Sequence, residues 1–383
     1  MARNFIVPKE IITGVGALTL AEERIKMLGT KALVVTDKIM VQLGNAGKVE
    51  EALQNQGIEF ATYADIAGEP NDVMIKKGLE VFKQEKCDFL IAIGGGSPID
   101  AMKAIALLAG NGGDIPDYAG KVISGSLPAM TAIPTTAGTG SEVTQFTVII
   151  DTNNDSKLLL KGRSLMPDIA VIDPQFTMTA PPGITAATGL DALTHAIEAY
   201  TSRESQTLSD SFALSAVKRI FQFLPTAFRG GDCVEAREQM AIAALEAGIA
   251  FNNSSVTLVH GMSRPIGALF HVPHGISNAM ILKECLTFAL SGAEKQFGDL
   301  GRAIHVAKEE DSDQESGLRF LQEVEKLCKE LKVPSMKEYG IDKEKYFEVI
   351  DKMARDAMES GSPQNTRRNV SQSDIEQLYK NNW

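Results

Sequence analysis

The sequence predicts an α/β N-terminal domain with a parallel sheet, followed by an all-α C-terminal domain, over 383 residues. Short β-branched apolar runs alternate with helical stretches as far as residues 170–173, a pattern typical of parallel sheets with helical crossovers. After Pro181 and Pro182 the apolar periodicity is that of helices alone. The chain is also longer than one hydrophobic core ordinarily serves. We therefore expect domains over residues 1–180 and 181–383.

The first half of the chain carries the strands and helices of that alternation in order. The expected strands are residues 31–37, 58–65 and 170–173, and the expected helices are residues 49–56 and 72–86. Residues 87–109 (CDFLIAIGGGSPIDAMKAIALLA) predict a strand, a glycine turn and a helix in direct succession. Residues 128–150 repeat the apolar run followed by a glycine-containing turn.

The second half shows helical periodicity with few runs that resemble strands. The expected helices are residues 191–202, 206–224, 235–253 and 317–332. The charged stretch KEEDSDQES at residues 308–316 is interpreted as a solvated loop and helix cap. An all-helical C-terminal domain follows.

Composition excludes several classes of protein. The formal net charge of −11 argues against nucleic-acid binding, which depends on a basic surface. No apolar run reaches membrane-spanning length, and MARNFIVPKE lacks the apolar core of a signal peptide. The four cysteines are widely spaced, at residues 87, 233, 285 and 328. We therefore expect free thiols and a cytoplasmic protein without a membrane or nucleic-acid partner.

Histidine is scarce, with 5 in the chain, and three of them fall within residues 260–278 (HGMSRPIGALFHVPHGISN). A fourth, His195, follows Asp191 by four residues on a predicted helix, so their side chains share a face. With His260 and His274, which we place in the turns LVHG and VPHG, they give one carboxylate and three imidazoles. This set suits Fe(II) or Zn(II) with an open coordination position. Helix capping or a solvated contact is the alternative for the pair on the helix.

The glycine turn GGGSPID, Gly94–Asp100, follows an apolar strand and opens a helix. Glycines let a ligand approach the backbone, and a helix N-terminus offers free N–H groups to a phosphate. A tight turn from strand to helix explains the same residues equally well. The turn is not the GxGxxG pattern, so the sequence does not support a standard Rossmann site.

Two further segments have the composition of a nucleotide site. Asp37 ends a predicted strand, where a carboxylate accepts hydrogen bonds from ribose hydroxyls and repels a 2′-phosphate. The hydroxyls and glycines of residues 134–144 (PTTAGTGSEVT) suit a phosphate or ribose. The alternatives are a turn aspartate and an ordinary polar loop. Lys157, Lys161 and Arg163 either neutralise a ligand charge or are solvated.

These motifs, in this order and over essentially the whole chain, resemble the iron-containing (group III, metal-dependent) alcohol dehydrogenase family. The most specific are GGGSPIDAMKAIA, PTTAGTGSEVT, TAATGLDALTHAIEAY and HGMSRPIGALFHVPHGISNAM. The resemblance implies a dinucleotide-binding α/β domain and a helical metal-binding domain, the architecture of dehydroquinate synthase. It implies NAD, one Fe(II) or Zn(II), and a homo-oligomer that is a dimer or a multiple of dimers. The implied metal ligands are Asp191, His195, His260 and His274. The implied NAD-binding residues are Asp37, Gly94, Gly95, Gly96, Ser97, Asp100, Thr135, Thr136, Thr139 and Lys157.

One position departs from the family pattern. Many members carry a histidine four residues after the third ligand, near substrate and nicotinamide, where this chain has Arg264. Arginine stays protonated and cannot relay a proton. Either Arg264 pairs with a neighbouring acid or phosphate, or it lines the pocket and binds a substrate carboxylate or sulfonate. His271, three residues before His274, is then a candidate for handling the proton.

The implied activity is metal-dependent, NAD(H)-linked interconversion of a short-chain primary alcohol and its aldehyde. The substrate bears an anionic group if Arg264 binds one. The alternatives are a glycerol- or diol-dehydrogenase-like enzyme, a dehydroquinate-synthase-like lyase, and a non-catalytic protein that keeps the fold.

Overall fold

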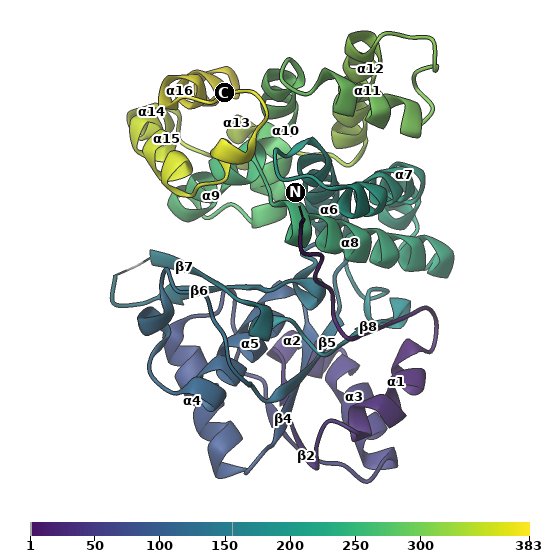
Figure 1. The fold of residues 1–383 in the computed structure, drawn as a ribbon, viewed down its shortest axis with the longest axis vertical. Helices are drawn as coiled ribbons and strands as arrows, with labels where there is room; N and C mark the ends of the chain where they lie inside the picture. Colours follow the sequence, from purple (N-terminus) through teal and green to yellow (C-terminus); the bar gives the residue numbers. More distant parts are fainter. Residues whose placement is uncertain (1, 155) are drawn as a thin grey trace. The chain divides into compact units, whose positions relative to one another are not determined.

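A six-stranded parallel sheet forms the centre of the unit Ile6–Ala180. The computed structural model describes residues 2–154 and 156–383. Its strands are β1 (Glu10–Thr13), β2 (Lys31–Val35), β3 (Glu59–Tyr63), β4 (Phe89–Gly94), β5 (Ala129–Pro134) and β8 (Ile169–Ile172). Their order is β1-β8-β5-β4-β2-β3, and every neighbouring pair is parallel. The predicted α/β fold with a parallel sheet is therefore confirmed (Figure 1).

Helices cover both faces of this sheet. They are α1 (Ala17–Lys26), α2 (Lys38–Gln42), α3 (Asn45–Asn55), α4 (Asp72–Gln84) and α5 (Gly96–Asn111). In β2, Ala32 and Val34 pack with α1 and α3, whereas Leu33 and Val35 pack with α4 and α5. Because both faces are covered, β2 and β4 read as continuous apolar runs in the sequence.

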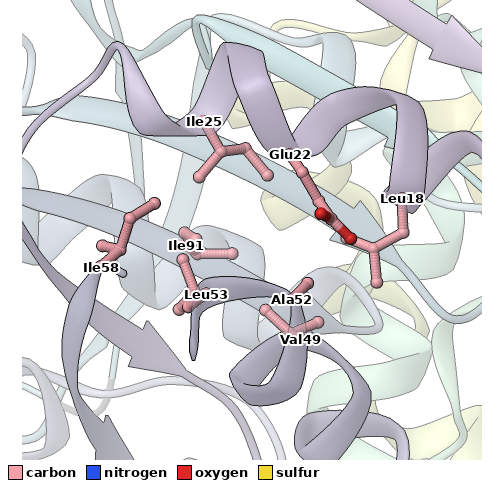
Figure 2. A pocket seen from close by; sticks show the side chains of 8 residues that line it. All are labelled: Leu18, Glu22, Ile25, Val49, Ala52, Leu53, Ile58 and Ile91. Carbon is pink, nitrogen blue, oxygen red and sulfur yellow. The ribbon is translucent and has the colours of Figure 1, made fainter. Parts of the chain in front are cut away.

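A small recess lies in the layer of α1 and α3. Figure 2 shows its lining, which is Leu18, Glu22, Ile25, Val49, Ala52, Leu53, Ile58 and Ile91. Seven of these eight side chains are apolar, and only Glu22 offers polar atoms. A ligand site ordinarily contains several convergent polar groups. We therefore interpret this recess as a gap in helix packing.

An antiparallel hairpin, which the sequence analysis did not anticipate, follows β5. It consists of β6 (Phe146–Asp151) and β7 (Ser156–Lys161). Ile149 and Leu160 are fully buried in the same core cluster as α5. The hairpin therefore covers part of that helix. Strand β1 was also missed, because it is short and lies at the edge of the sheet.

The second unit comprises Pro181–Trp383 and a few N-terminal residues up to Phe5, and its described residues form helices and no strand. The longer helices are α6 (Pro182–Thr201), α7 (Thr207–Arg229), α8 (Val234–Ser254), α9 (Leu258–Phe270), α10 (His274–Leu290), α11 (Glu294–Ala303) and α12 (Asp313–Glu330). The remaining ones are α13 (Met336–Tyr339), α14 (Lys343–Glu348), α15 (Ile350–Glu359) and α16 (Gln372–Asn381). The all-helical prediction is confirmed.

Helix α6 is the central element of this unit. Its residues from Gly189 to Thr201 are all buried, against α7, α8 and α10. Small residues let these helices approach closely. At Gly189, for example, an added Cβ would lie 2.4 Å from the Leu224 side chain of α7. The polar residues of α6 are therefore held rigidly inside the bundle.

In the part of the chain that the structure describes, no single helix is long and apolar enough to cross a membrane. The bent pair α8 and α9, at 105°, meets the length and composition criteria only when its two helices are taken together.

Candidate metal centre and nucleotide recess

Three helices of the second unit supply the four predicted metal ligands. Asp191 and His195 lie one turn apart on α6, His260 lies in α9, and His274 is the first residue of α10. The predicted turn at LVHG is wrong, because His260 is helical. Pro265 inside α9 had obscured the helix in the sequence, since proline usually ends one. Asp191, His195 and His260 are nearly inaccessible, whereas the side chain of His274 is 44% exposed.

The ligand atoms are spaced as they would be around a common ion. One atom each from Asp191, His195 and His260 lies within 4.8 Å of the others. Asp191 Oδ1 lies 3.6 Å from His260 Nε2 and 3.5 Å from His274 Nε2. Tetrahedral ligands about 2.1 Å from zinc are about 3.4 Å apart. In addition, His195 Nδ1 is buried and has no hydrogen-bond partner among the described residues. Asp191, His195 and His260 could therefore hold a divalent metal together, and His274 Nε2 lies close to the same oxygen of Asp191.

Burial and charge favour the ligating protonation states at two of these residues. Burial lowers the pKa of His195 to about 3, so this imidazole is neutral at physiological pH. Burial opposes ionisation of Asp191, but the adjacent histidines outweigh it and hold its pKa well below the usual range. An ionised carboxylate and a neutral imidazole are the forms that bind metals.

Two polar residues that were not predicted from the sequence contact the proposed ligands. Glu198, on the same face of α6, has Oε2 2.6 Å from His260 Nδ1. Asn278, one turn after His274, donates from Nδ2 to Asp191 Oδ1 at 2.7 Å. Both side chains are fully buried. Glu198 lies three residues after His195, and Asn278 lies four residues after His274. Helical periodicity therefore places each of them on the same face as a proposed ligand.

Arg264 and His271 differ in their surroundings. Arg264 lies one turn after His260 on α9, is partly buried, and donates to Ser362 Oγ at 3.1 Å. No carboxylate of the described residues lies within ion-pair distance of its guanidinium. His271 ends α9 in a left-handed conformation, with φ 54°, and is exposed. The described contacts include no hydrogen bond between His271 and the four ligands.

The first unit contains a recess of about 450 Å³ at the carboxyl ends of its strands. It opens between β2 and β4, where the crossover connections diverge toward β3 and β5. Such a switch point is the usual ligand position in open α/β sheets. The lining residues are Asp37, Lys38, Ile39, Ala64, Asp65, Ile66, Ala67, Gly68, Gly95, Gly96, Ser97 and Pro98. Four of the predicted nucleotide residues therefore share one recess.

Asp37 also has a structural role in a turn, which is the alternative to ligand binding. It is the N-cap of α2 and accepts a hydrogen bond from Met40 N through Oδ1 at 2.9 Å. A carboxylate has a second oxygen with its own lone pairs. Capping and ribose recognition are therefore compatible at Asp37.

Several other predicted residues adjoin the glycine turn. Thr135 N donates to Gly94 O at 2.9 Å, which joins the ends of β5 and β4. A Cβ on Gly96 would lie 3.1 Å from Thr139, and one on Gly95 would lie 3.6 Å from Thr136. The threonine-rich loop is therefore packed beside the turn.

Asp100 and Lys157 are engaged within the protein. The Asp100 carboxylate accepts from the Ser141 hydroxyl and from Val148 N. Lys157 Nζ lies 2.6 Å from Glu69 Oε1 in an ion pair. Neither residue is among those that line the recess.

A buried lysine that the sequence analysis missed stabilises the loop after the threonines. Lys103 is fully buried, and its Nζ donates to the backbone oxygens of Ser141, Thr144 and Phe146 at 2.6, 2.8 and 2.8 Å. The adjacent Glu142 is only 2% exposed, and burial raises its pKa to about 7. Lys103 therefore compensates carbonyl groups that would otherwise be buried without partners.

Comparison with protein families matches nearly the whole chain. The family described as iron-containing alcohol dehydrogenase matches residues 8–174, and its C-terminal region matches residues 185–383. Among curated relatives, the NAD-dependent methanol dehydrogenase of Bacillus methanolicus is 36% identical over 381 residues, covering 99% of each chain. The lactaldehyde reductase of Escherichia coli (strain K12) is 34% identical over 392 residues, covering 100% of each.

Solved structures give the same result. A 1,3-propanediol oxidoreductase matches with a TM-score of 0.97 and 32% identity, over 100% of both chains. The sulfoacetaldehyde reductase from Bifidobacterium kashiwanohense, solved in complex with NAD+, matches with a TM-score of 0.87 and 27% identity. That match covers 100% of this chain and 98% of the other.

Proposed function

The chain belongs to the iron-containing alcohol dehydrogenase family, and from this we propose that it is an NAD(H)-dependent oxidoreductase that interconverts a primary alcohol and its aldehyde. The observation that carries the proposal is the buried cluster of Asp191, His195 and His260, with His274 beside it. The names of the relatives support the activity, since they are dehydrogenases of alcohols and reductases of aldehydes. The lining of the nucleotide recess supports NAD.

Each part of the proposed reaction has residues suited to it. Asp191, His195, His260 and His274 would hold Fe(II) or Zn(II), since imidazole and carboxylate ligands accept either. Such an ion supplies Lewis acidity, which lowers the pKa of an alcohol hydroxyl and polarises an aldehyde oxygen. The partly exposed side chain of His274 marks the side on which the ligand cluster is open.

The nucleotide recess suits a dinucleotide in the same way. The glycine turn and the N-terminus of α5 offer backbone N–H groups to a pyrophosphate. Asp37 accepts from the ribose hydroxyls, and its charge disfavours a 2′-phosphate. The proposal is therefore NAD(H) in preference to NADP(H), and kinetic preference for NADP(H) would contradict the role of Asp37.

For the substrate, we propose an aldehyde or alcohol that bears a carboxylate or sulfonate, bound by Arg264. Arg264 lies one turn from His260, and only one hydrogen bond to a described side chain, Ser362, uses its five N–H donors. A partly buried guanidinium without a carboxylate partner is suited to an anion. The likeness to a sulfoacetaldehyde reductase is in keeping with this choice.

Steady-state kinetics with matched aldehydes test the proposal. Wild type and Arg264→Met are compared on a sulfonate-bearing, a carboxylate-bearing and a neutral aldehyde of similar length. A hydrogen bond to a charged group contributes about 1.5–3 kcal/mol. We therefore expect kcat/KM to fall about 10- to 100-fold for the anionic substrates and less than about threefold for the neutral one. Arg219→Met, which removes a partly buried arginine paired with Glu246, is the control.

The same panel distinguishes a second candidate function. The high similarity to a 1,3-propanediol oxidoreductase favours a neutral alcohol or diol as substrate. Equal loss on all three aldehydes, or a clear preference of wild type for the neutral one, would replace the anionic substrate by this alternative. Arg264→His restores the residue that many family members carry, and we expect it to favour neutral substrates further.

Location and assembly complete the proposal. The four cysteines are free thiols, which supports a cytoplasmic protein. We include a homo-oligomer built of dimers in the proposal, and exposed large apolar side chains in and next to α1 are in keeping with it. Val15, Leu20 and Met27 are 71%, 70% and 77% exposed, and burial in an interface would remove them from water.

A further inference from the structure

Glu198 is a fully buried carboxylate that contacts the proposed ligand His260, and the proposed reaction gives it no role of its own. We propose that Glu198 is a positioning residue that keeps the proton of His260 on Nδ1, so that the lone pair of Nε2 is directed at the metal. The inference rests on the proposed metal site. It adds a residue that determines the affinity and orientation of one ligand.

The hydrogen bonds of Glu198 define its role. Oε2 lies 2.6 Å from His260 Nδ1, while Oε1 accepts from Thr257 Oγ1 at 2.7 Å and from Val259 N at 2.6 Å. An ionised carboxylate only accepts hydrogen bonds, so His260 Nδ1 must be the donor. The other ring nitrogen, Nε2, is the one that lies 3.6 Å from the ligand Asp191.

The backbone contact makes this arrangement rigid. Thr257 is the N-cap residue of α9 and Val259 lies in its first turn, so Glu198 satisfies an N–H group that the helix itself leaves free. The carboxylate therefore fixes the start of α9 and the His260 ring together. Thr257 and Val259 are at most 4% exposed, so water is not available to replace the bonds.

Glutamine at this position would have about the same shape but cannot make the same bonds. All three partners of Glu198 are hydrogen-bond donors, and both carboxylate oxygens accept from them. Glutamine has only one oxygen that accepts, and its NH2 group is a donor. If the amide oxygen stays with Val259 N, the NH2 group faces Nδ1 and forces the proton onto Nε2, where the metal binds. If the amide is turned, two N–H donors face each other. Either outcome opposes metal binding.

Outer residues of this kind typically change metal affinity or activity 10- to 100-fold when mutated. We therefore expect Glu198→Gln to raise the Kd for Zn(II) about 10- to 100-fold. Glu198→Asp keeps the charge but is too short to reach both Nδ1 and Val259 N, so we expect an intermediate Kd. Glu246→Gln is the matched control, because it removes a largely buried carboxylate that bonds Ser215 and Arg219 and touches no ligand.

Two measurements on the full chain test the inference. The first is the Zn(II) Kd of metal-depleted protein by competition with a chromophoric chelator, alongside unfolding of each variant to show that it is folded. The second is the tautomer of His260 from 15N NMR of the histidine rings in metal-depleted wild type, recorded at a pH at which the His260 ring carries a single proton. Only 5 histidines are present, and His260→Ala assigns the signal.

The outcomes separate the inference from the proposed function. A weaker Kd in Glu198→Gln, an unchanged Kd in Glu246→Gln, and a proton on Nδ1 of His260 support the inference. Zinc binding by Glu198→Gln as tight as that of wild type, or a singly protonated wild-type ring with its proton on Nε2, overturns it. If Glu198→Gln does not fold, the wild-type tautomer decides. Failure of wild type to bind any divalent metal would instead overturn the proposed function, and the inference with it.

Discussion

The metal centre and the nucleotide recess are built in different ways. The proposed metal centre consists of side chains from α6, α9 and α10, and three of its four proposed ligands are nearly inaccessible. The recess lies at the carboxyl ends of β2 and β4, and two adjacent glycines, Gly95 and Gly96, form part of its wall where α5 begins. Function at the first therefore depends on which side chains are present. Function at the recess depends on the absence of side chains at Gly95 and Gly96.

Each site is also supported by a buried charge, with a different partner. Behind the metal centre, Glu198 faces the imidazole of a ligand. Beside the recess, Lys103 faces three backbone oxygens of the loop after the threonines. The carboxylate of Glu198 thus affects the protonation of a proposed ligand. The ammonium of Lys103 stabilises the conformation of a loop. Substitutions should separate these two kinds of support.

The largest effect is expected at a metal ligand. His260→Ala removes a buried ligand and leaves Glu198 without its imidazole partner. We expect loss of metal retention and a fall in kcat/KM of roughly a thousandfold or more, beyond the 10- to 100-fold typical of outer residues. Metal content by mass spectrometry and NADH consumption with an aldehyde measure both.

His305→Ala is the control for that prediction. His305 is exposed and lies outside the ligand set, so its loss tests for a general effect of removing an imidazole. We expect normal metal content and activity. Full activity of His260→Ala with its metal retained would contradict the metal centre.

The grouping of Asp191, His195 and His260 was predictable from the sequence, because histidine is scarce in this chain and the spacing of Asp191 and His195 fits one helix face. Asp191 and His195 needed only the period of a helix. Glu198 shares that face, but its partner lies on α9, and the sequence does not specify which helices meet. Asn278 was missed for the same reason. The helix around His260 was hidden by Pro265, whose missing N–H usually ends a helix.

In the α/β unit the glycine turn was predictable, while its support was not. Continuous apolar runs specify strands buried on both faces, and a glycine run between strand and helix specifies a turn at the sheet edge. The sequence does not reveal that Asp100 bonds Ser141 and Val148, because that contact depends on the unexpected hairpin. Lys103 was missed because a charged residue in an apolar helix is by default assigned to solvent.

A smaller effect is expected when a side chain is added to the recess. Gly95 has φ −71°, which any residue adopts, and an added Cβ would make only an ordinary contact with Thr136 at 3.6 Å. Gly95→Ala should therefore fold normally. Its methyl group would lie at the recess wall, where overpacking against a ligand costs about 1–3 kcal/mol. We expect the Kd for NADH, from fluorescence titration, to rise about 5- to 100-fold.

Gly47→Ala provides the comparison for Gly95→Ala. Gly47 is exposed on α3, and an added Cβ would meet no atom within 4 Å. We expect its Kd for NADH to match that of wild type and its Tm to be equal or slightly higher, because alanine favours a helix more than glycine does. An unchanged Kd in Gly95→Ala would mean that the dinucleotide does not contact this wall. It would contradict the importance given to the glycines of the recess.

The last expected effect is on stability and not on ligand binding, and it comes from the buried Glu142 in the loop after the threonines. Burial raises the pKa of Glu142 from 4.5 to about 7, so between these values the folded chain holds a proton that the unfolded chain has released. This contribution to stability is fully present below pH 4.5 and is lost as the pH rises to about 7. Glu142→Gln cannot ionise, so its stability relative to wild type should increase over that window. One pKa unit corresponds to about 1.4 kcal/mol, and we expect a relative gain of roughly 1–3 kcal/mol in urea unfolding.

Glu51→Gln, at an exposed position of α3, is the control, and its free energy of unfolding should change with pH in parallel with that of wild type. If the free energy of unfolding of Glu142→Gln also changed with pH in parallel with that of wild type, Lys103 would keep the Glu142 carboxylate ionised. Glu142 would then resemble Glu198, whose carboxylate is kept ionised by His260.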